Sequence, residues 1–343
     1  IDWLAALARA HGRRIMVRLV KGAYLDSEIK RAQVMGLDSY PVYTRKALTD
    51  VSFAACARRL LANDDAIYPQ FATHNALTAA IVREIAGERR DYELQRLHGM
   101  GEALHDHLIA AGGRSRIYAP VGGHKELLPY LVRRLLENGA NSSFVNQLFD
   151  PDLSVEQIVA DPVEIAKSLS VLPNPAIPAP RDQFQGARLA ARGHDPNHPD
   201  DAAMLARAVG AKLDALAAPI VSGRTRQGAT EDVKNPARRS ERVGATVIAD
   251  ASLVEEACKA ALDAQPDWAK LPAAARADIF RRAADMLEER DAKFMQLATR
   301  EAGKNIPDAI AEVREAVDFL RYYADEGEKL SGAPLGVVAC ISP

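Results

Sequence analysis

The chain has 343 residues, a hydrophobic content of 48% and a nearly even balance of 44 Lys plus Arg against 46 Asp plus Glu. This length predicts two domains rather than one, and the composition is typical of a globular protein rather than a disordered, fibrous or membrane one. Proteins that bind nucleic acid non-specifically usually carry a basic excess, so the net charge of −2 disfavours that class.

The cysteines and the apolar runs indicate in which cellular compartment the protein is expected. Cys56, Cys258 and Cys340 lie far apart without a C-x-x-C pair, so neither a disulfide framework nor a zinc knuckle is expected. No apolar run approaches the roughly 20 residues that span a bilayer, and the start of the chain lacks the apolar core of a signal peptide. We therefore expect a cytoplasmic protein. Because the chain starts at Ile1 and stops within "LGVVACISP", we interpret it as a fragment of a longer protein.

Residues 1–150 repeat one pattern, in which a short apolar strand is followed by a polar or glycine-containing turn and an amphipathic helix. This alternation predicts βαβ units and a parallel sheet, which could be half of a (β/α)8 barrel or part of an open doubly wound sheet. Polar residues follow several of the strands, as at a barrel's active site, so we favour the barrel. The expected strands are 14–20, 68–74, 92–98 and 115–121, and the expected helices lie near 45–62, 75–86, 102–111 and 125–138.

Residues 151–220 are dense in Pro, Gly, Asp and Asn, which favour turns and extended chain, and we interpret them as a linker. A short Ala-rich helix is expected within this linker at about 201–217. Residues 221–343 form the third part of the chain. We expect hairpin-like strands at its start, helices near 252–264, 273–299 and 307–329, and a strand in the terminal apolar run that contains Cys340.

The segment "YLVRRLLENGANSSF" places Arg133 and Arg134 side by side on an amphipathic helix. Tyr130 lies three and four positions before them and therefore shares their face. Two adjacent guanidinium groups can hold a carboxylate through paired hydrogen bonds and orient a small amino or imino acid. A solvated basic face, or ion pairs with Glu126 and Glu137, is the alternative interpretation of the same spacing.

Two further positions suggest contacts with a cofactor. Arg18 lies within an expected strand, where a charge is costly to bury unless it is paired with a cofactor's electron-rich ring or phosphate, or with an ordinary carboxylate. In "FATHNA", Asn75 is a good N-cap for the next helix, and a helix N-terminus is a natural phosphate site. Plain capping, with His74 as a satisfied polar residue, is the alternative.

Four histidines within 27 positions suggest a metal site, but their spacing disfavours one. Two of them are only two positions apart on an expected helix and so point in different directions, and neither an H-E-x-x-H motif nor a carboxylate triad is present. We therefore expect no metal. The histidines are His98, His105, His107 and His124.

Taken together, "VRLVKGAYLDSEIKRAQ", "YPQFATHNA", "LHGMGE" and "RIYAPVGGHKELLPYLVRRLLENGANSSFVNQLF" resemble the C-terminal half of the proline dehydrogenase barrel of the bifunctional proline utilization (PutA) family. The segments "VKNPARRSERVGATV", "AQPDWAKLPAAARADIFRRAADMLEER" and "PLGVVACISP" resemble the N-terminal part of the aldehyde dehydrogenase module that follows in the same family. The resemblance implies an α/β chain: half a (β/α)8 barrel at 1–150, a linker at 151–220, and the start of a Rossmann-like aldehyde dehydrogenase domain at 221–343.

The resemblance implies FAD-dependent oxidation of L-proline to pyrroline-5-carboxylate, then NAD-dependent oxidation of glutamate semialdehyde to glutamate. Arg18 would lie near the flavin ring and stabilise the negative charge of its reduced form, while the paired arginines would hold the proline carboxylate. The family's proline pocket corresponds to Tyr24, Leu97, Tyr118, Tyr130, Arg133 and Arg134. Its FAD contacts correspond to Arg18, Val20, Lys21, Gly22, Thr73, His74, Asn75, Gln95, Glu137 and Phe144. Ile341 and Ser342 match the start of a nicotinamide-side motif.

The resemblance also implies what the chain lacks. The family's catalytic cysteine and activating glutamate fall beyond residue 343, so no cysteine here receives a catalytic role and most of the NAD site lies outside the chain. The early barrel strands, which supply a lysine and an aspartate to the proline site, are missing too, so we expect the fragment alone to be inactive.

The family further implies homo-oligomerisation, peripheral association with the inner membrane for electron transfer to quinone, and DNA binding only where a separate N-terminal segment exists. Two alternatives stay open from the residues themselves. One is a non-catalytic module that binds nucleic acid or a partner through its basic helices. The other is a metal-dependent barrel enzyme, such as an aldolase or lyase.

Overall fold

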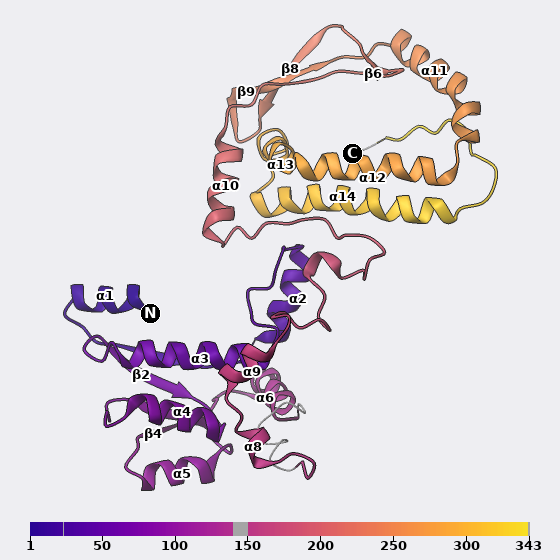
Figure 1. The fold of residues 1–343 in the computed structure, drawn as a ribbon. Coiled ribbons are helices and arrows are strands. Elements are labelled where there is room, and N and C mark those ends of the chain that lie inside the picture. Colours follow the sequence, from indigo (N-terminus) through magenta and orange to yellow (C-terminus); the bar gives the residue numbers. More distant parts are fainter. Residues whose placement is uncertain (23, 140–149, 342–343) are drawn as a thin grey trace. The chain divides into compact units, whose positions relative to one another are not determined.

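The computed structural model describes all residues except 23, 140–149 and 342–343, and for residues 133–139 it describes the backbone alone. The described chain forms two compact units (Figure 1). The first contains Ile1–Asp26 and Val42–Ile177, and the second contains Ser27–Pro41 and Pro178–Pro343. No helix in the described part of the chain is long and apolar enough to cross a membrane.

A parallel sheet forms the centre of the first unit. Its strands, in spatial order, are β1 (Ile15–Leu19), β2 (Ile67–Ala72), β3 (Glu93–Leu97) and β4 (Ser115–Tyr118). Each strand pairs in parallel with the one before it in sequence, as in a barrel wall, whereas a doubly wound sheet reverses its strand order at a switch point. The predicted strands and the half barrel are confirmed.

Helices cover one face of this sheet and form the first unit's core with it. Phe71 and Ile67 of β2 are fully buried there beside Leu60 of α3 and Val82 of α4. Burying a large apolar side chain of this kind stabilises the fold by about 1.5–3 kcal/mol. The helices of this part of the chain are α1 (Asp2–Ala10), α3 (Lys46–Leu61), α4 (Ala76–Ala86), α5 (Glu102–Ala110) and α6 (His124–Gly139). The last four were predicted, and α1 was missed.

Successive side chains of a strand point to opposite sides of the sheet, so the alternate residues of each strand lie on the face away from the helices. Most of these residues are polar. In a closed barrel this face would line the interior. It carries Arg18 from β1, Gln70 from β2, Glu93 and Gln95 from β3, and Arg116 from β4, and hydrogen bonds join these side chains across the strands.

The predicted linker contains more regular structure than its composition indicates. Helix α8 (Val155–Ile158) begins with a capping box at Ser154, and α9 (Pro162–Ser168) begins with Asp161 as N-cap and packs against α3. A 3-10 turn, η1, follows at Pro180–Asp182. Helix α2 (Leu25–Met35) was also not predicted, and from Ser27 onward it belongs to the second unit.

Strands and hairpins open the aldehyde dehydrogenase-like part of the chain, as predicted. Strands β6 (Ile220–Val221) and β7 (Arg224–Thr225) form an antiparallel pair. A second sheet has the order β5 (Ala215–Ala217), β9 (Arg238–Val247), β8 (Thr230–Asn235). The predicted Ala-rich helix, α10, spans Pro199–Gly210 only. Residues predicted to end it form β5 instead, because they pair with β9.

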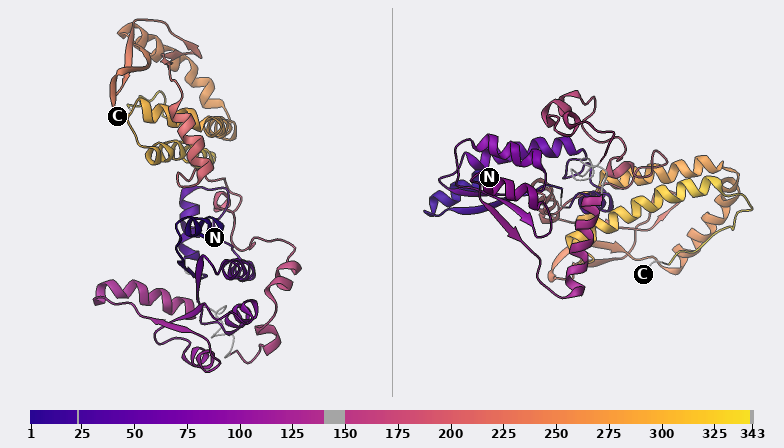
Figure 2. Two further views of the ribbon diagram at one scale, coloured as in Figure 1. Left: turned by 90° about the vertical axis from the view of Figure 1, so that its left-hand side faces the viewer. Right: turned by 90° about the horizontal axis from the view of Figure 1, so that it is seen from below.

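Four helices complete the second unit: α11 (Ala251–Lys270), α12 (Ala273–Glu289), α13 (Asp291–Arg300) and α14 (Ile306–Lys329). Helices α12 and α14, orange and yellow, lie side by side in both Figure 1 and Figure 2 and pack along each other. The helix predicted at 273–299 is in fact two, which meet at Arg290. The predicted strand around Cys340 is wrong for the described residues, since up to Ile341 this segment pairs with no described strand.

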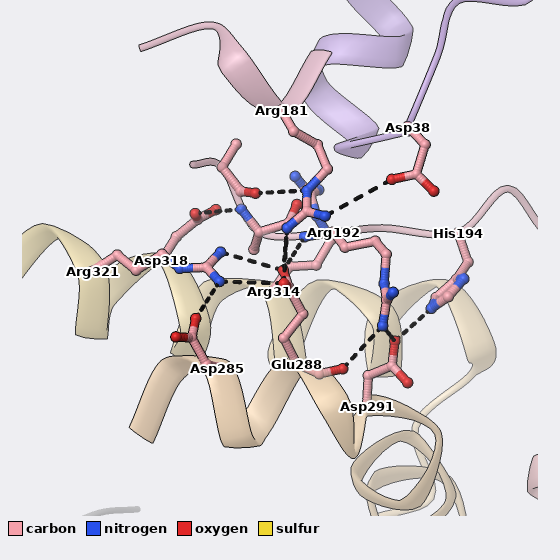
Figure 3. Close-up of polar contacts among 12 residues, drawn as sticks. Asp38, Arg181, Arg192, His194, Asp285, Glu288, Asp291, Arg314, Asp318 and Arg321 are labelled. Carbon is pink, nitrogen blue, oxygen red and sulfur yellow. Dashed lines mark hydrogen bonds and ion pairs between the residues drawn. The ribbon is translucent and has the colours of Figure 1, made fainter. Parts of the chain in front are cut away.

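Hydrogen bonds and ion pairs hold segment 181–194 to the helices of the second unit (Figure 3). Glu288 of α12 accepts hydrogen bonds from both Arg181 Nη2 (2.8 and 2.9 Å) and the backbone N–H of Arg192 (2.6 Å), and Arg321 of α14 lies within 3.3 Å of it. His194 pairs with Asp291 at 2.7 Å. Burial would raise the pKa of Glu288, but the Arg321 and Arg192 hydrogen bonds outweigh it and hold the pKa below its usual value.

Candidate functional site

The predicted site residues of the barrel half gather at the carboxyl ends of the four parallel strands. Lys21 and Gly22 follow β1, Thr73 to Asn75 follow β2, Leu97 ends β3 and Tyr118 ends β4. Because the strands are parallel, these ends meet at one edge of the sheet, where barrel enzymes place their active sites.

Arg18, Gln95 and Tyr118 come into direct contact although they lie on three different strands. The Nε of Arg18 donates to the side-chain oxygen of Gln95 at 2.9 Å. The guanidinium carbon lies 4.9 Å from the centre of the Tyr118 ring, a distance typical of a cation–π contact. The side chain of Arg18 is exposed, and within the described residues it forms no ion pair. Among the described residues, its positive charge therefore has neutral partners, Gln95 and Tyr118, rather than a carboxylate.

Glu93 supports this cluster and was not among the predicted site residues. Its side chain is only 5% exposed, and it accepts two hydrogen bonds from Arg116, at 2.6 and 2.8 Å. The amide of Gln95 donates to it at 2.7 Å. The guanidinium of Arg116 lowers the pKa of Glu93 to about 2. The sequence did contain a signal for Glu93: it is a carboxylate within the expected strand "ELQRL", two positions before Gln95 and therefore on the same face of the sheet.

Lys21 points to protein partners at the edge of the sheet. Its ammonium group contacts the carboxylate of Asp50, donates to the Thr78 hydroxyl at 2.8 Å and lies 5.0 Å from the Phe53 ring centre. Burial lowers the pKa of Lys21 despite the nearby carboxylate. Lys21 and Asn75 line a cavity of about 240 Å³ between α3, α4 and the helices α8 and α9.

The segment from Thr73 to Asn75 is fixed by hydrogen bonds on both sides. Asn75 caps α4, because its side chain accepts from the Thr78 N–H at 2.9 Å, and the capping prediction is confirmed. The Thr73 hydroxyl accepts from the Asn75 N–H at 3.1 Å. His74 Nε2 accepts from the backbone N–H of Leu97 at 3.0 Å, which ties the end of β2 to the end of β3.

His105 explains part of the histidine cluster. It is fully buried, with Nδ1 2.7 Å from the Ser115 hydroxyl and Nε2 3.0 Å from the Thr73 carbonyl oxygen. Burial lowers the pKa of His105, which favours the neutral ring. Within the described ranges, no group of three or more His, Cys, Asp or Glu side chains could hold a metal ion.

Several predicted site residues are placed only in part. Arg133, Arg134 and Glu137 lie on helix α6, but their side chains are outside the described residues, as are Phe144 and Ser342 altogether. The remaining predicted residues differ in exposure. Tyr130 is half-buried on α6, and Leu97 is buried, whereas Val20, Tyr24 and Ile341 are exposed.

The order of the two parts agrees with comparisons to known proteins. Residues 1–147 match the model of the proline dehydrogenase family, and residues 224–343 match that of the aldehyde dehydrogenase family. The bifunctional protein PutA of Salmonella typhimurium is 47% identical over 364 residues, which cover 100% of this chain and 28% of that protein. The bifunctional protein PutA of Rhizobium meliloti is 43% identical, over 100% of this chain and 29% of that protein.

Solved structures show the same relationship. A crystal structure of a bifunctional proline utilization A protein is 44% identical, with a TM-score of 0.79 over 97% of this chain and 32% of that one. The Bdellovibrio bacteriovorus proline utilization A structure, inactivated by N-propargylglycine, is 30% identical with a TM-score of 0.79, over 96% and 34%. The chain thus spans less than a third of the curated relatives' length, 28% and 29%. It belongs to the PutA family and comprises proline dehydrogenase sequence followed by aldehyde dehydrogenase sequence.

Proposed function

We propose that this chain supplies part of the flavin and proline sites of a bifunctional enzyme of proline catabolism. That enzyme oxidises L-proline to pyrroline-5-carboxylate and then oxidises glutamate semialdehyde to glutamate with NAD. The observation that carries the proposal is the contact of Arg18 with Gln95 and Tyr118 at the carboxyl edge of the barrel sheet.

The donor set of the barrel half suits a flavin. Arg18 offers a positive charge whose described partners are neutral, and reduction makes the flavin ring more negative. Gly22 has φ +81° and open space where a Cβ would stand, so the backbone after β1 could lie close to a ring. The N-terminus of α4 after Asn75 suits a diphosphate. Bound FAD would supply the hydride-accepting chemistry.

The chain's own residues would bind and orient. Arg18 would stabilise negative charge on the reduced ring, and the buried side chain of Leu97 with the Tyr118 ring would keep water from the apolar face of proline. Lys21 already contacts Asp50, so a phosphate at this lysine would share its ammonium group with that carboxylate.

Arg133 and Arg134 remain the residues that we propose for the proline carboxylate. Their helix, α6, follows β4, and Tyr130 lies one turn before them on the same helix. Two guanidinium groups would fix the orientation of proline, which is their contribution to the rate. Glu137 and Phe144 are proposed, from the resemblance alone, to contact FAD.

The second part of the chain is proposed to begin the NAD-dependent module, with Ile341 and Ser342 on the nicotinamide side. We infer that the chain by itself does not oxidise proline, because the described sheet supplies four strands of an eight-stranded wall. Homo-oligomerisation and peripheral association with the inner membrane are further proposals from the family resemblance.

The test uses the whole PutA-type protein that carries this chain. Its visible absorption is recorded before and after addition of proline, for the wild type and for Arg133→Met. We expect flavin bands that bleach with proline, and bleaching at much higher proline concentration in the variant. Arg83→Met, an exposed arginine on α4, is the matched control and should bleach like the wild type. A colourless protein, or a yellow one that proline leaves unchanged, would refute the proposed function.

A further inference from the structure

The carboxylate of Glu93 is the most heavily hydrogen-bonded side chain on the described polar face of the barrel sheet. Arg116 donates to it twice, and the amides of Gln95 and Gln70 donate at 2.7 and 2.8 Å. The Tyr68 hydroxyl lies 3.3 Å away. These partners come from β2, β3 and β4, so the carboxylate is anchored from both neighbouring strands.

This anchoring fixes the direction of the Gln95 amide. An ionised carboxylate can only accept hydrogen bonds, so Gln95 must turn its NH2 group toward Glu93. Its carbonyl oxygen then points the other way, to the Nε of Arg18 at 2.9 Å. If the amide were reversed, two donors would face each other at Arg18. Glu93 thereby makes Gln95 an acceptor for the guanidinium.

We propose that Glu93 is a positioning residue of the flavin site, which acts through Gln95 to hold the guanidinium of Arg18 in place. The proposal rests on the proposed function, since it takes Arg18 to lie beside the flavin ring. Glu93 keeps its charge at neutral pH, because Arg116 holds its pKa near 2. A purely structural role, in which Glu93 and Arg116 only join β3 to β4, is the competing explanation.

A double-mutant cycle in the flavin-loaded whole protein separates these two roles. The flavin midpoint potential is measured without proline in the wild type, Glu93→Gln, Arg18→Met and the double variant. Loss of the Glu93 charge by itself favours the reduced flavin in both backgrounds. Glu93→Gln should also release the Arg18 guanidinium from its place beside the flavin, which disfavours the reduced flavin. This second effect can occur only in proteins that still contain Arg18.

We therefore expect the Glu93→Gln shift to be less positive in the wild-type background than in the Arg18→Met background. The expected difference is about tenfold in the reduction equilibrium, the size of one hydrogen bond to a charged group. For a two-electron couple this is about 30 mV. Equal shifts in the two backgrounds would overturn the proposal and leave Glu93 with a structural or purely long-range role.

Asp91→Asn is the matched control. Asp91 also pairs with two arginines, Arg14 and Arg114, but it lies before β3, at the end of the strand away from the site. Its effect should be equal in both backgrounds. If Glu93→Gln does not fold, Gln95→Leu removes the same link without a change of charge. Because Gln95 is itself an expected FAD contact, the readout is the difference between backgrounds: Gln95→Leu should lower the potential more when Arg18 is present than in the Arg18→Met background.

The outcomes also separate this proposal from the proposed function. A colourless wild type refutes both. A yellow wild type that proline does not bleach refutes the proline reaction, while the cycle still decides the role of Glu93. A wild type that proline bleaches, with an additive cycle, overturns the positioning role alone.

Discussion

Replacing Glu288 with alanine tests whether charges hold segment 181–194 in place within the second unit. The Glu288 side chain is 15% exposed, and its partners Arg181 and Arg321 are 21% and 9% exposed. Removing one member of a buried ion pair leaves the others uncompensated and costs about 3–5 kcal/mol. Because Arg321 keeps Asp285 as a partner, at 3.0 Å, we expect the lower end of that range.

Hydrogen exchange of the whole protein, resolved by peptide, measures this loss where it occurs. Local opening that becomes easier by about 3 kcal/mol accelerates exchange by roughly a hundredfold. We expect this acceleration at the backbone N–H groups of Ala191 and Arg192, which donate to Asp318 and Glu288.

Asp278→Ala on the same helix is the control for this experiment. Asp278 pairs with Arg281 three positions later, and its side chain is 59% exposed. An exposed pair of this kind contributes no more than about 1 kcal/mol. If Glu288→Ala changed exchange in segment 181–194 no more than Asp278→Ala does, Glu288 would not hold this segment.

Two further predictions concern stability: one tests the packing of β5 against β9, and the other tests how the contribution of Glu93 on β3 depends on pH. Gly244→Ala should lower the thermal unfolding temperature, because its Cβ would lie 2.1 Å from the Ala215 carbonyl oxygen on β5, whereas Gly210→Ala, with nothing within 4 Å, should not lower it. The pKa of Glu93 is lowered from 4.5 to about 2, so its contribution to stability is complete above pH 4.5 and is lost as pH falls through about 2. Acid titration of unfolding should therefore show a smaller loss in Glu93→Gln; an equal loss in both proteins would contradict this.

The elements of the barrel half could be predicted because apolar strand segments alternate there with segments of helix length. Helix α2 breaks this alternation, since it follows β1 as an additional helix before α3, and "LDSEIKRAQVM" buries only one residue, Ala32. The break at Arg290 lacks the glycine or proline that would mark it. The strand expected around Cys340 failed for a different reason: an apolar run forms a strand only when a neighbour pairs with its backbone groups.

The contacts within the site could not be predicted from the sequence pattern of any single strand either. Arg18, Gln95 and Tyr118 were predicted from the family resemblance, but the contacts of Arg18 with the other two depend on the strand order that brings β1, β3 and β4 into one sheet. Neither the role of Glu93 nor that of Arg116 follows from the spacing within one strand. Both depend on the register that places Gln95 opposite Arg116 on the next strand.

That register also bears on why a carboxylate stands at this position at all. An ion pair between a buried carboxylate and an exposed arginine, such as Glu93 and Arg116, is weak evidence for stability, since well-packed apolar residues of similar volume often stabilise a fold as well or better. Glu93 and Arg116 are therefore poorly explained as a fastening between β3 and β4. Orientation explains them better, because an apolar side chain at residue 93 would leave the Gln95 NH2 group without this acceptor and its amide held only by Arg18. On this argument, the charge within the sheet is retained for the direction that it gives its neighbour.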